Sequence, residues 1–206
     1  MLGFIQCLNA RFGWWDDRET ALGKARSYTD KALELEPGNA DAYRTSSVLL
    51  LVQGRYDEAV ADAKRSVELA PGSADVAELA SFVLASSGFP EEAVMLIEKA
   101  MALSPNFPPV YLGVLGHAYR LSGRIEEAIA AFKAYDARNP GFGLTDLVIA
   151  YQQKGQPDEA KRAAMRLLAA RRDFTIASWL KTQFRRDTAR LEADVAALRA
   201  AELPMG

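Results

Sequence analysis

Hydrophobic residues recur at helical rather than strand spacing along most of the chain. Ala59, Ala63 and Val67 stand at i, i+4 and i+8, which places them on one face of a helix. Before them, residues 40–53 contain the run SVLLLV, which is apolar on every side of a helix. No stretch alternates apolar and polar residues over a useful strand length. The pattern therefore predicts an all-α chain.

A short corner motif interrupts this helical pattern four times. GRYDEA begins at Gly54, and GFPEEA, GRIEEA and GQPDEA begin at Gly88, Gly123 and Gly155, in steps of 34, 35 and 32 residues. Glycine enters the left-handed region that closes a helix, and the acidic residues that follow favour the positive end of the next helix. A period near 34 predicts repeated helical hairpins, and it explains the acidic pairs as helix starts rather than acid–base pairs.

Small residues and closing prolines recur at fixed places in the hairpins, except that Arg172 stands where the last hairpin would have its proline. The small residues, where two helices approach closely, are Ala59, Ala93, Ala128 and Ala160. The prolines that follow a last helical turn are Pro37, Pro71, Pro105 and Pro140. We therefore divide the chain into repeats 40–73, 74–107, 108–142 and 143–172, after a degenerate first repeat, 1–39, whose corner GWWDDRET is longer.

The stretch LGHAYRLSGRIEEAIAAFKAYDARNP resembles the tetratricopeptide repeat family. The residues that match its motif are Leu115, Gly116, Tyr119, Gly123, Ala128, Phe132 and Pro140. The resemblance extends over roughly four-fifths of the chain. It implies a single domain over residues 1–206, a right-handed superhelical solenoid of about five hairpins, and binding of other proteins rather than catalysis.

Residues 173–206 are predicted to be capping helices. The last hairpin of a solenoid needs a cover with a polar outer side. Asp187 is suited to begin a helix as its N-cap, and Leu191, Val195 and Leu198 line one face of that helix. The segment DFTIASWLKTQF before it is predicted to be a further helix with Trp179 turned inward.

A narrower resemblance concerns the two ends of the chain. ARFGWWDD near the start and FTIASWLKTQFRRDTARLEADVAALRAAELP at the end are similar to C-terminal regions of bacterial class III adenylate cyclases and related regulators. The catalytic domain of those proteins has no counterpart in these residues, so the resemblance carries no cyclase activity. It implies an alternative role, a regulatory or dimerisation arm of a cyclase-like signalling protein.

Composition argues against several other classes. The 25 basic and 27 acidic residues nearly cancel, which gives no sign of a nucleic-acid or membrane partner. Cys7 is the only cysteine and His117 the only histidine, too few for a thiolate cluster or a zinc site, so we expect no metal. The family resemblance implies in addition no cofactor and no enzyme. No apolar run approaches the ~20 residues of a membrane span, and the N-terminus lacks secretory features, which indicates the cytoplasm.

The resemblance implies that the first helix of each hairpin lines a concave, partner-binding face. The repeat spacing places these residues on it: Arg44, Val48, Leu51, Glu78, Phe82, Ala85, His117, Arg120, Ile149 and Gln152. They predict a groove with an apolar centre and scattered charge, suited to another protein, a peptide segment or a second copy of the chain. The alternative is that a neighbouring helix or the chain's own tail covers this face.

Residues 161–186 form a basic segment in which Asp173 is the only acid. Its basic residues are Lys161, Arg162, Arg166, Arg171, Arg172, Lys181, Arg185 and Arg186. We interpret it first as a solvated face; the alternatives are a site for an acidic protein or an anion and, less favoured, for nucleic acid. The corner with Trp14 and Trp15 is interpreted as core or cap packing rather than as an interface anchor.

Overall fold

A computed structural model describes residues 2–12 and 17–206. Within these residues every regular element is a helix, which confirms the all-α prediction. The chain forms two compact units, Met1–Ser104 with Phe184–Arg186 (unit 1) and Pro105–Gln183 with Asp187–Gly206 (unit 2). The corner residues Trp14 and Trp15 lie outside the described residues.

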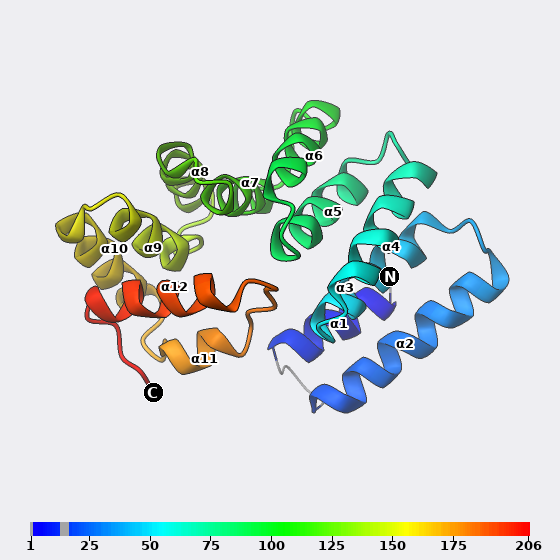
Figure 1. Cartoon of the computed structure of the whole chain (residues 1–206), viewed down its shortest axis with the longest axis horizontal. Coiled ribbons are helices and arrows are strands. Elements are labelled where there is room, and N and C mark those ends of the chain that lie inside the picture. Colours follow the sequence, from blue (N-terminus) through cyan, green and yellow to red (C-terminus); the bar gives the residue numbers. More distant parts are fainter. Residues whose placement is uncertain (1, 13–16) are drawn as a thin grey trace. The chain divides into compact units, whose positions relative to one another are not determined.

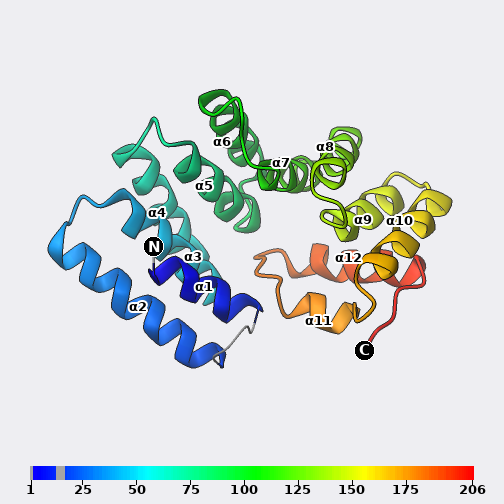
Figure 2. The ribbon, with the colours of Figure 1, turned by 180° about the vertical axis from the view of Figure 1, so that it is seen from behind.

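Unit 1 consists of three helical hairpins. Its helices are α1 (Leu2–Phe12), α2 (Arg18–Leu35), α3 (Ala40–Val52), α4 (Tyr56–Leu69), α5 (Ala74–Ser86) and α6 (Pro90–Leu103). Figures 1 and 2 show the pairing of α1 with α2, α3 with α4, and α5 with α6. The first helices of the hairpins also pack on one another, α1 on α3 and α3 on α5, so their side chains share one face.

Unit 2 contains two more hairpins and a C-terminal segment. Its helices are α7 (Val110–Leu121), α8 (Ile125–Arg138), α9 (Leu144–Gln153), α10 (Pro157–Ala170), α11 (Ile176–Leu180) and α12 (Thr188–Ala200). The helix α12 lies along α9 (Figure 1). One apolar core joins α8, α9 and α10 with Trp179, Leu198 and Leu203. The C-terminal segment therefore completes the core of this unit.

The four repeated corners adopt the backbone that their glycines predict. Gly54, Gly88, Gly123 and Gly155 have φ angles of 76°, 99°, 82° and 73°, in the left-handed region. A side chain is strained at such a φ angle, which is why the same residue returns at each corner.

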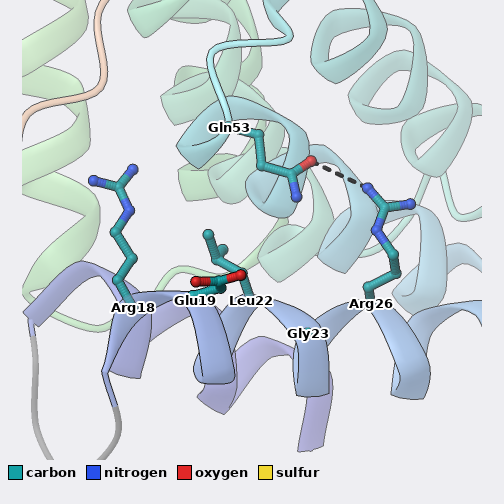
Figure 3. Close-up of a pocket in the computed structure, with 6 residues that line it drawn as sticks. All are labelled: Arg18, Glu19, Leu22, Gly23, Arg26 and Gln53. Carbon is teal, nitrogen blue, oxygen red and sulfur yellow. Dashed lines mark hydrogen bonds between the residues drawn. The ribbon is translucent and has the colours of Figure 1, made fainter.

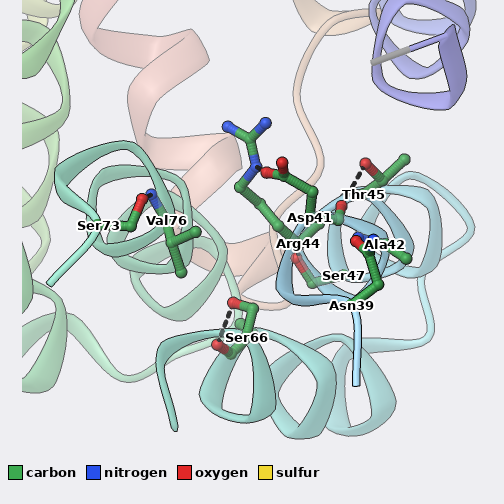
Figure 4. A network of polar contacts seen from close by, with 10 residues as sticks. Asn39, Asp41, Ala42, Arg44, Thr45, Ser47, Ser66, Ser73 and Val76 are labelled. Atoms are coloured by element: carbon green, nitrogen blue, oxygen red, sulfur yellow. Dashed lines mark hydrogen bonds and ion pairs between the residues drawn. The ribbon is translucent and has the colours of Figure 1, made fainter. Parts of the chain in front are cut away.

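Helix starts are fixed by local polar side chains. The side chains of Asn39 and Ser73 accept hydrogen bonds from the backbone N–H groups of Ala42 and Val76, at 2.9 and 3.4 Å (Figure 4). These N-caps satisfy backbone donors that a first helical turn leaves without partners. They begin the first helices of two hairpins, α3 and α5.

Close packing of the two helices in a hairpin depends on residues with small side chains. Ala59, Ala93, Ala128 and Ala160 are fully buried, as their recurrence predicts. In the third full hairpin the contact is tighter still, because a Cβ atom added at Gly116 would lie 2.6 Å from Cε1 of the buried Phe132. Gly116 therefore allows α7 to approach α8.

We expect Gly116→Ala to lower the free energy of unfolding by about 1–2 kcal/mol. Overpacking a fixed core costs about 1–3 kcal/mol, against a gain of up to ~1 kcal/mol from alanine's helix propensity. Gly23→Ala in α2 is the matched control, because an added Cβ would meet nothing within 4 Å there. Urea denaturation of both variants measures the difference, and equal stability of the two would contradict the packing argument.

The capping segment agrees with the sequence in part. Asp187 caps α12 by accepting a hydrogen bond from the backbone N–H of Arg190, at 2.9 Å, and Trp179 is buried, both as predicted. The helix predicted within residues 173–184 is shorter than expected. The Thr182 hydroxyl donates to the carbonyl of Trp179 at 2.7 Å, a local bond of the kind that competes with helix continuation.

Candidate functional site: the concave helices

The first helices of unit 1 bring aromatic rings and guanidinium groups together. The Arg44 guanidinium lies 5.3 Å from the ring centroid of Phe4, and the Arg11 guanidinium lies 5.0 Å from that of Phe82. Both are cation–π contacts between neighbouring helices. They connect α1, α3 and α5 into one surface of mixed charge and aromatic character.

Arg44 is held in place on this surface by its own helix. Its Nε atom lies 3.0 Å from a carboxylate oxygen of Asp41, one turn earlier (Figure 4). The Arg44 side chain keeps 19% of its surface exposed. A guanidinium so oriented retains N–H donors suited to a carboxylate.

Glu78 occupies the matched position on α5 and has an altered ionisation. Burial, together with the nearby charge of Asp75 and against the opposing effect of Arg44, raises the pKa of its carboxyl to about 7. This carboxyl therefore changes charge close to neutral pH. Together, Arg44, Glu78 and Phe82 form a partly exposed cluster that we call the unit 1 face, with Phe4 and Arg11 at its edge.

The apolar residues predicted for the groove are buried. In unit 1 these are Val48, Leu51 and Ala85. They contribute to packing between helices, so the partly exposed side chains of the unit 1 face are polar or aromatic.

Unit 2 differs because its own α12 covers the matched positions. Arg120 is 0% exposed, and its Nη1 lies 2.8 Å from Oδ1 of Asp194 on α12, a side chain that is also 0% exposed. Asp146 approaches the same guanidinium at 3.5 Å. Arg120, predicted to lie toward a partner, thus faces the chain's own tail, which is the alternative that the sequence left open.

The other predicted residues of unit 2 are buried or partly buried. Ile149 is fully buried, and His117 and Gln152 are partly buried. Arg190 of α12 donates to the backbone carbonyl of Leu121, at 2.5 Å, which fixes the tail at the end of α7. This face is closed by intramolecular packing.

Most basic side chains of the segment 161–186 form ion pairs or hydrogen bonds within the chain. Lys161 pairs with Glu202, Arg162 with Glu159, Arg166 with Asp136, and Arg186 with Asp57. Arg171 donates to the Thr145 hydroxyl at 2.9 Å, and Arg185 is buried. Arg172 and Lys181 are exposed. Six of the eight residues belong to unit 2 and two to unit 1, so each unit holds its part separately.

A pocket of about 430 Å³ lies between α2 and the end of α3 in unit 1. Figure 3 shows Arg18 at one end and Arg26 at the other, with Gln53 above. Arg26 donates to the Gln53 side chain at 3.1 Å, and Arg18 donates to the Val52 carbonyl at 2.7 Å. Both guanidinium groups therefore already form hydrogen bonds that link the first hairpin to the second.

The remaining candidate chemistry is limited within the described part of the chain. Burial raises the pKa of the Cys7 thiol to about 12, which keeps it protonated at neutral pH. Among residues 2–12 and 17–206, no three histidine, cysteine or acidic side chains gather in a way that could hold a metal ion. No helix in those ranges is both long and apolar enough to cross a membrane.

Sequence reasoning missed three contributors to these faces. Phe4 and Arg11 stand at i and i+7 on one side of α1, a spacing that the degenerate first repeat concealed. Asp194 is separated from Arg120 by 74 residues, and local sequence holds no signal of that pairing.

Comparison with known families supports the repeat interpretation. Tetratricopeptide repeat models match residues 22–74 and residues 110–142. A search of curated proteins returns no match. Each unit therefore holds a segment that matches a tetratricopeptide repeat model.

Solved structures share this fold. PilW, a type IV pilus biogenesis factor, is 18% identical with a TM-score of 0.71, over 98% of this chain and 90% of PilW. A thermophilic tetratricopeptide repeat protein of Thermus thermophilus is 19% identical with a TM-score of 0.65, over 89% and 92%. YrrB, described as having an unusual peptide-binding site, is 22% identical with a TM-score of 0.58, over 75% and 80%. At these identities the likeness concerns the fold.

Proposed function

We propose that this tetratricopeptide-repeat chain is a non-enzymatic scaffold that binds a segment of another protein on the unit 1 face. Proteins with this fold generally mediate protein–protein interaction. The observation that carries the proposal is the contrast between the two units. Arg44, Glu78 and Phe82 stay partly exposed, whereas α12 covers Arg120 and its neighbours in unit 2.

The chemistry of the unit 1 face favours a segment that carries both acidic and apolar side chains. Arg44 and Arg11 offer guanidinium groups to carboxylates, and Phe82 and Phe4 offer aromatic surface. Since the residues stand on packed helices, they lose little conformational freedom when a partner binds. A pre-formed surface of this kind suits a scaffold.

A capture experiment with matched variants tests this proposal. The double variant Arg44→Glu, Phe82→Ala alters the unit 1 face, while Lys99→Glu, Met95→Ala makes the same kind of change at exposed positions of α6. We expect a protein retained by the parent and the control to be lost at least tenfold from the face variant, since a reversed charge at a binding centre costs more than ~1.4 kcal/mol.

Two outcomes would contradict the proposal. Equal retention by both double variants, each shown to be folded by circular dichroism, would place the binding surface elsewhere. Light scattering on the same samples detects binding between copies, and a dimer broken by the face variant, with no other protein retained, would replace the scaffold by self-association.

A further inference from the structure

A tripeptide of the C-terminal segment lies on unit 1, although the residues on either side of it belong to unit 2. Phe184–Arg186 separates α11 from α12 and has no regular secondary structure. Its partners come from α2, α4 and the end of α5, more than 90 residues earlier in the sequence. These contacts show which chemical groups the rest of unit 1 places around the tripeptide.

The backbone of the tripeptide is recognised from two sides. The Tyr56 hydroxyl donates to the Arg185 carbonyl at 3.0 Å, and the Arg186 N–H donates to the Ser86 carbonyl at 3.0 Å. Ser86 is the last residue of α5, where helix carbonyls lack partners within the helix. Such main-chain bonds accept any residue type, so they hold the segment without selecting its sequence.

The side chains supply the selectivity. The Arg18 guanidinium lies 5.0 Å from the ring centroid of Phe184, a cation–π contact. The Arg186 guanidinium forms two bonds to the Asp57 carboxylate, at 2.6 and 3.3 Å, in the paired geometry typical of arginine recognition. Arg185 between them is buried. Each position of the tripeptide therefore has its own environment on unit 1.

The strength of these contacts is moderate. The Arg186 and Asp57 side chains keep 47% and 78% of their surface exposed, and exposed ion pairs contribute little to stability. The Phe184 ring is partly exposed. Besides the buried Arg185, the tripeptide is held by two backbone bonds, one cation–π contact and one exposed ion pair, whereas α12 is held by an ion pair whose two side chains are both fully buried. The weaker set suits a contact that opens and closes.

We propose that unit 1 carries a docking site for a non-helical segment of the type aromatic–Arg–Arg, which Phe184–Arg186 occupies in this chain and which a partner protein with the same chemistry takes over. Tyr56, Asp57, Ser86 and Arg18 form this site, which we call the tripeptide site. It does not use Arg44 or Glu78 of the unit 1 face. Because the tripeptide belongs to the same chain, it competes with a partner for this site at a high effective concentration. A partner must therefore bind more tightly than it would to an empty site.

The test uses a fluorescein-labelled peptide with the sequence of residues 180–189, LKTQFRRDTA. In the emptied variant, Phe184→Gly, Arg185→Ser and Arg186→Gly remove the tethered ligand. Fluorescence anisotropy is expected to show at least tenfold tighter peptide binding to the emptied variant than to the parent. A peptide with both arginines replaced by glutamate is expected to bind at least tenfold more weakly.

Further changes in the emptied variant locate the binding. Asp57→Ala with Tyr56→Phe removes the ion pair and one backbone bond, and we expect it to weaken peptide binding at least tenfold. Arg44→Glu leaves the tripeptide site intact and is expected to leave peptide binding unchanged. This control separates the inference from the scaffold function proposed for the unit 1 face.

Three results would overturn the proposal. They are no peptide binding to a folded emptied variant, equal binding to the emptied variant and the parent, or binding that is unchanged by Asp57→Ala with Tyr56→Phe. If the emptied variant does not fold, Asp57→Ala in the otherwise unchanged chain tests whether the tripeptide contact can be released. We expect faster hydrogen exchange at the Arg186 amide there, and unchanged exchange would refute a releasable contact.

Discussion

Replacing Asp194 with alanine is expected to lower the free energy of unfolding of unit 2 by about 3–5 kcal/mol. The substitution leaves the Arg120 guanidinium buried without its 2.8 Å partner, and removal of one member of a buried ion pair has a cost of this size. Asp146, 3.5 Å from the guanidinium, replaces the lost interaction only in part. Hydrogen exchange of α9 and α12 amides under native conditions measures the loss of stability in unit 2 separately from unit 1.

Two comparison variants show whether the loss comes from the unpaired charge. Lys31→Ala removes one member of the exposed Lys31–Glu34 pair and is expected to change stability below the limit of measurement. Arg120→Met combined with Asp194→Leu removes both charges and is expected to recover most of the stability lost by Asp194→Ala. An Asp194→Ala cost below ~1 kcal/mol would show that the pair is open to water, contrary to its burial.

The same ion pair explains why unit 2 and unit 1 present different faces from one repeated sequence pattern. Matched positions carry Leu51 in α3, Ala85 in α5 and Arg120 in α7. Of these three, Arg120 has a charge that must be neutralised when buried, and Asp194 brings α12 onto it. A single polar residue in the repeat therefore selects where the tail can pack.

Local signals explain how much of the fold could be predicted from the sequence. The left-handed corner at Gly54, the N-cap at Asp187 and the buried Ala128 each follow from residues within one or two helical turns. Repetition at a period near 34 then predicted the hairpins, because the same local rule recurs. The exposed or buried state of the concave residues could not follow from these rules.

Long-range contacts account for the features that the sequence could not predict. Asp194 meets Arg120 from 74 residues away, and Arg186 meets Asp57 from 129 residues away. Both pairs belong to the C-terminal segment, which lies outside the repeat and so has no template in the preceding hairpins. A charged residue in a repeat position and an opposite charge in the tail are compatible with many pairings, and three-dimensional packing selects one.

Raising the pH from 5 to 8 is expected to lower the stability of unit 1 through Glu78 by on the order of 2–3 kcal/mol. The pKa of its carboxyl is raised to about 7 by burial, above its ordinary value of 4.5. Between these values the folded state holds a proton that the unfolded state has released. The stabilisation is thus present at low pH and is lost as the pH rises through 7.

Glu78→Gln isolates this contribution, because glutamine does not titrate. The difference in stability between the variant and the parent is expected to shift in favour of the variant as the pH rises, and to level off above pH 7. Urea denaturation at a series of pH values gives this difference. A constant difference across the series would mean that Glu78 is hydrated in the folded protein.

Arg44→Leu tests the second cause of the Glu78 ionisation. Arg44 acts to lower the pKa of Glu78, so its removal is expected to move the titration to higher pH and to increase the stability lost on full ionisation. A partner that places a cation beside Glu78 would have the opposite effect, because it favours the charged carboxylate. Binding of such a partner should strengthen between pH 5 and 7, whereas binding through Arg44 and Phe82 alone should not gain from the loss of this proton.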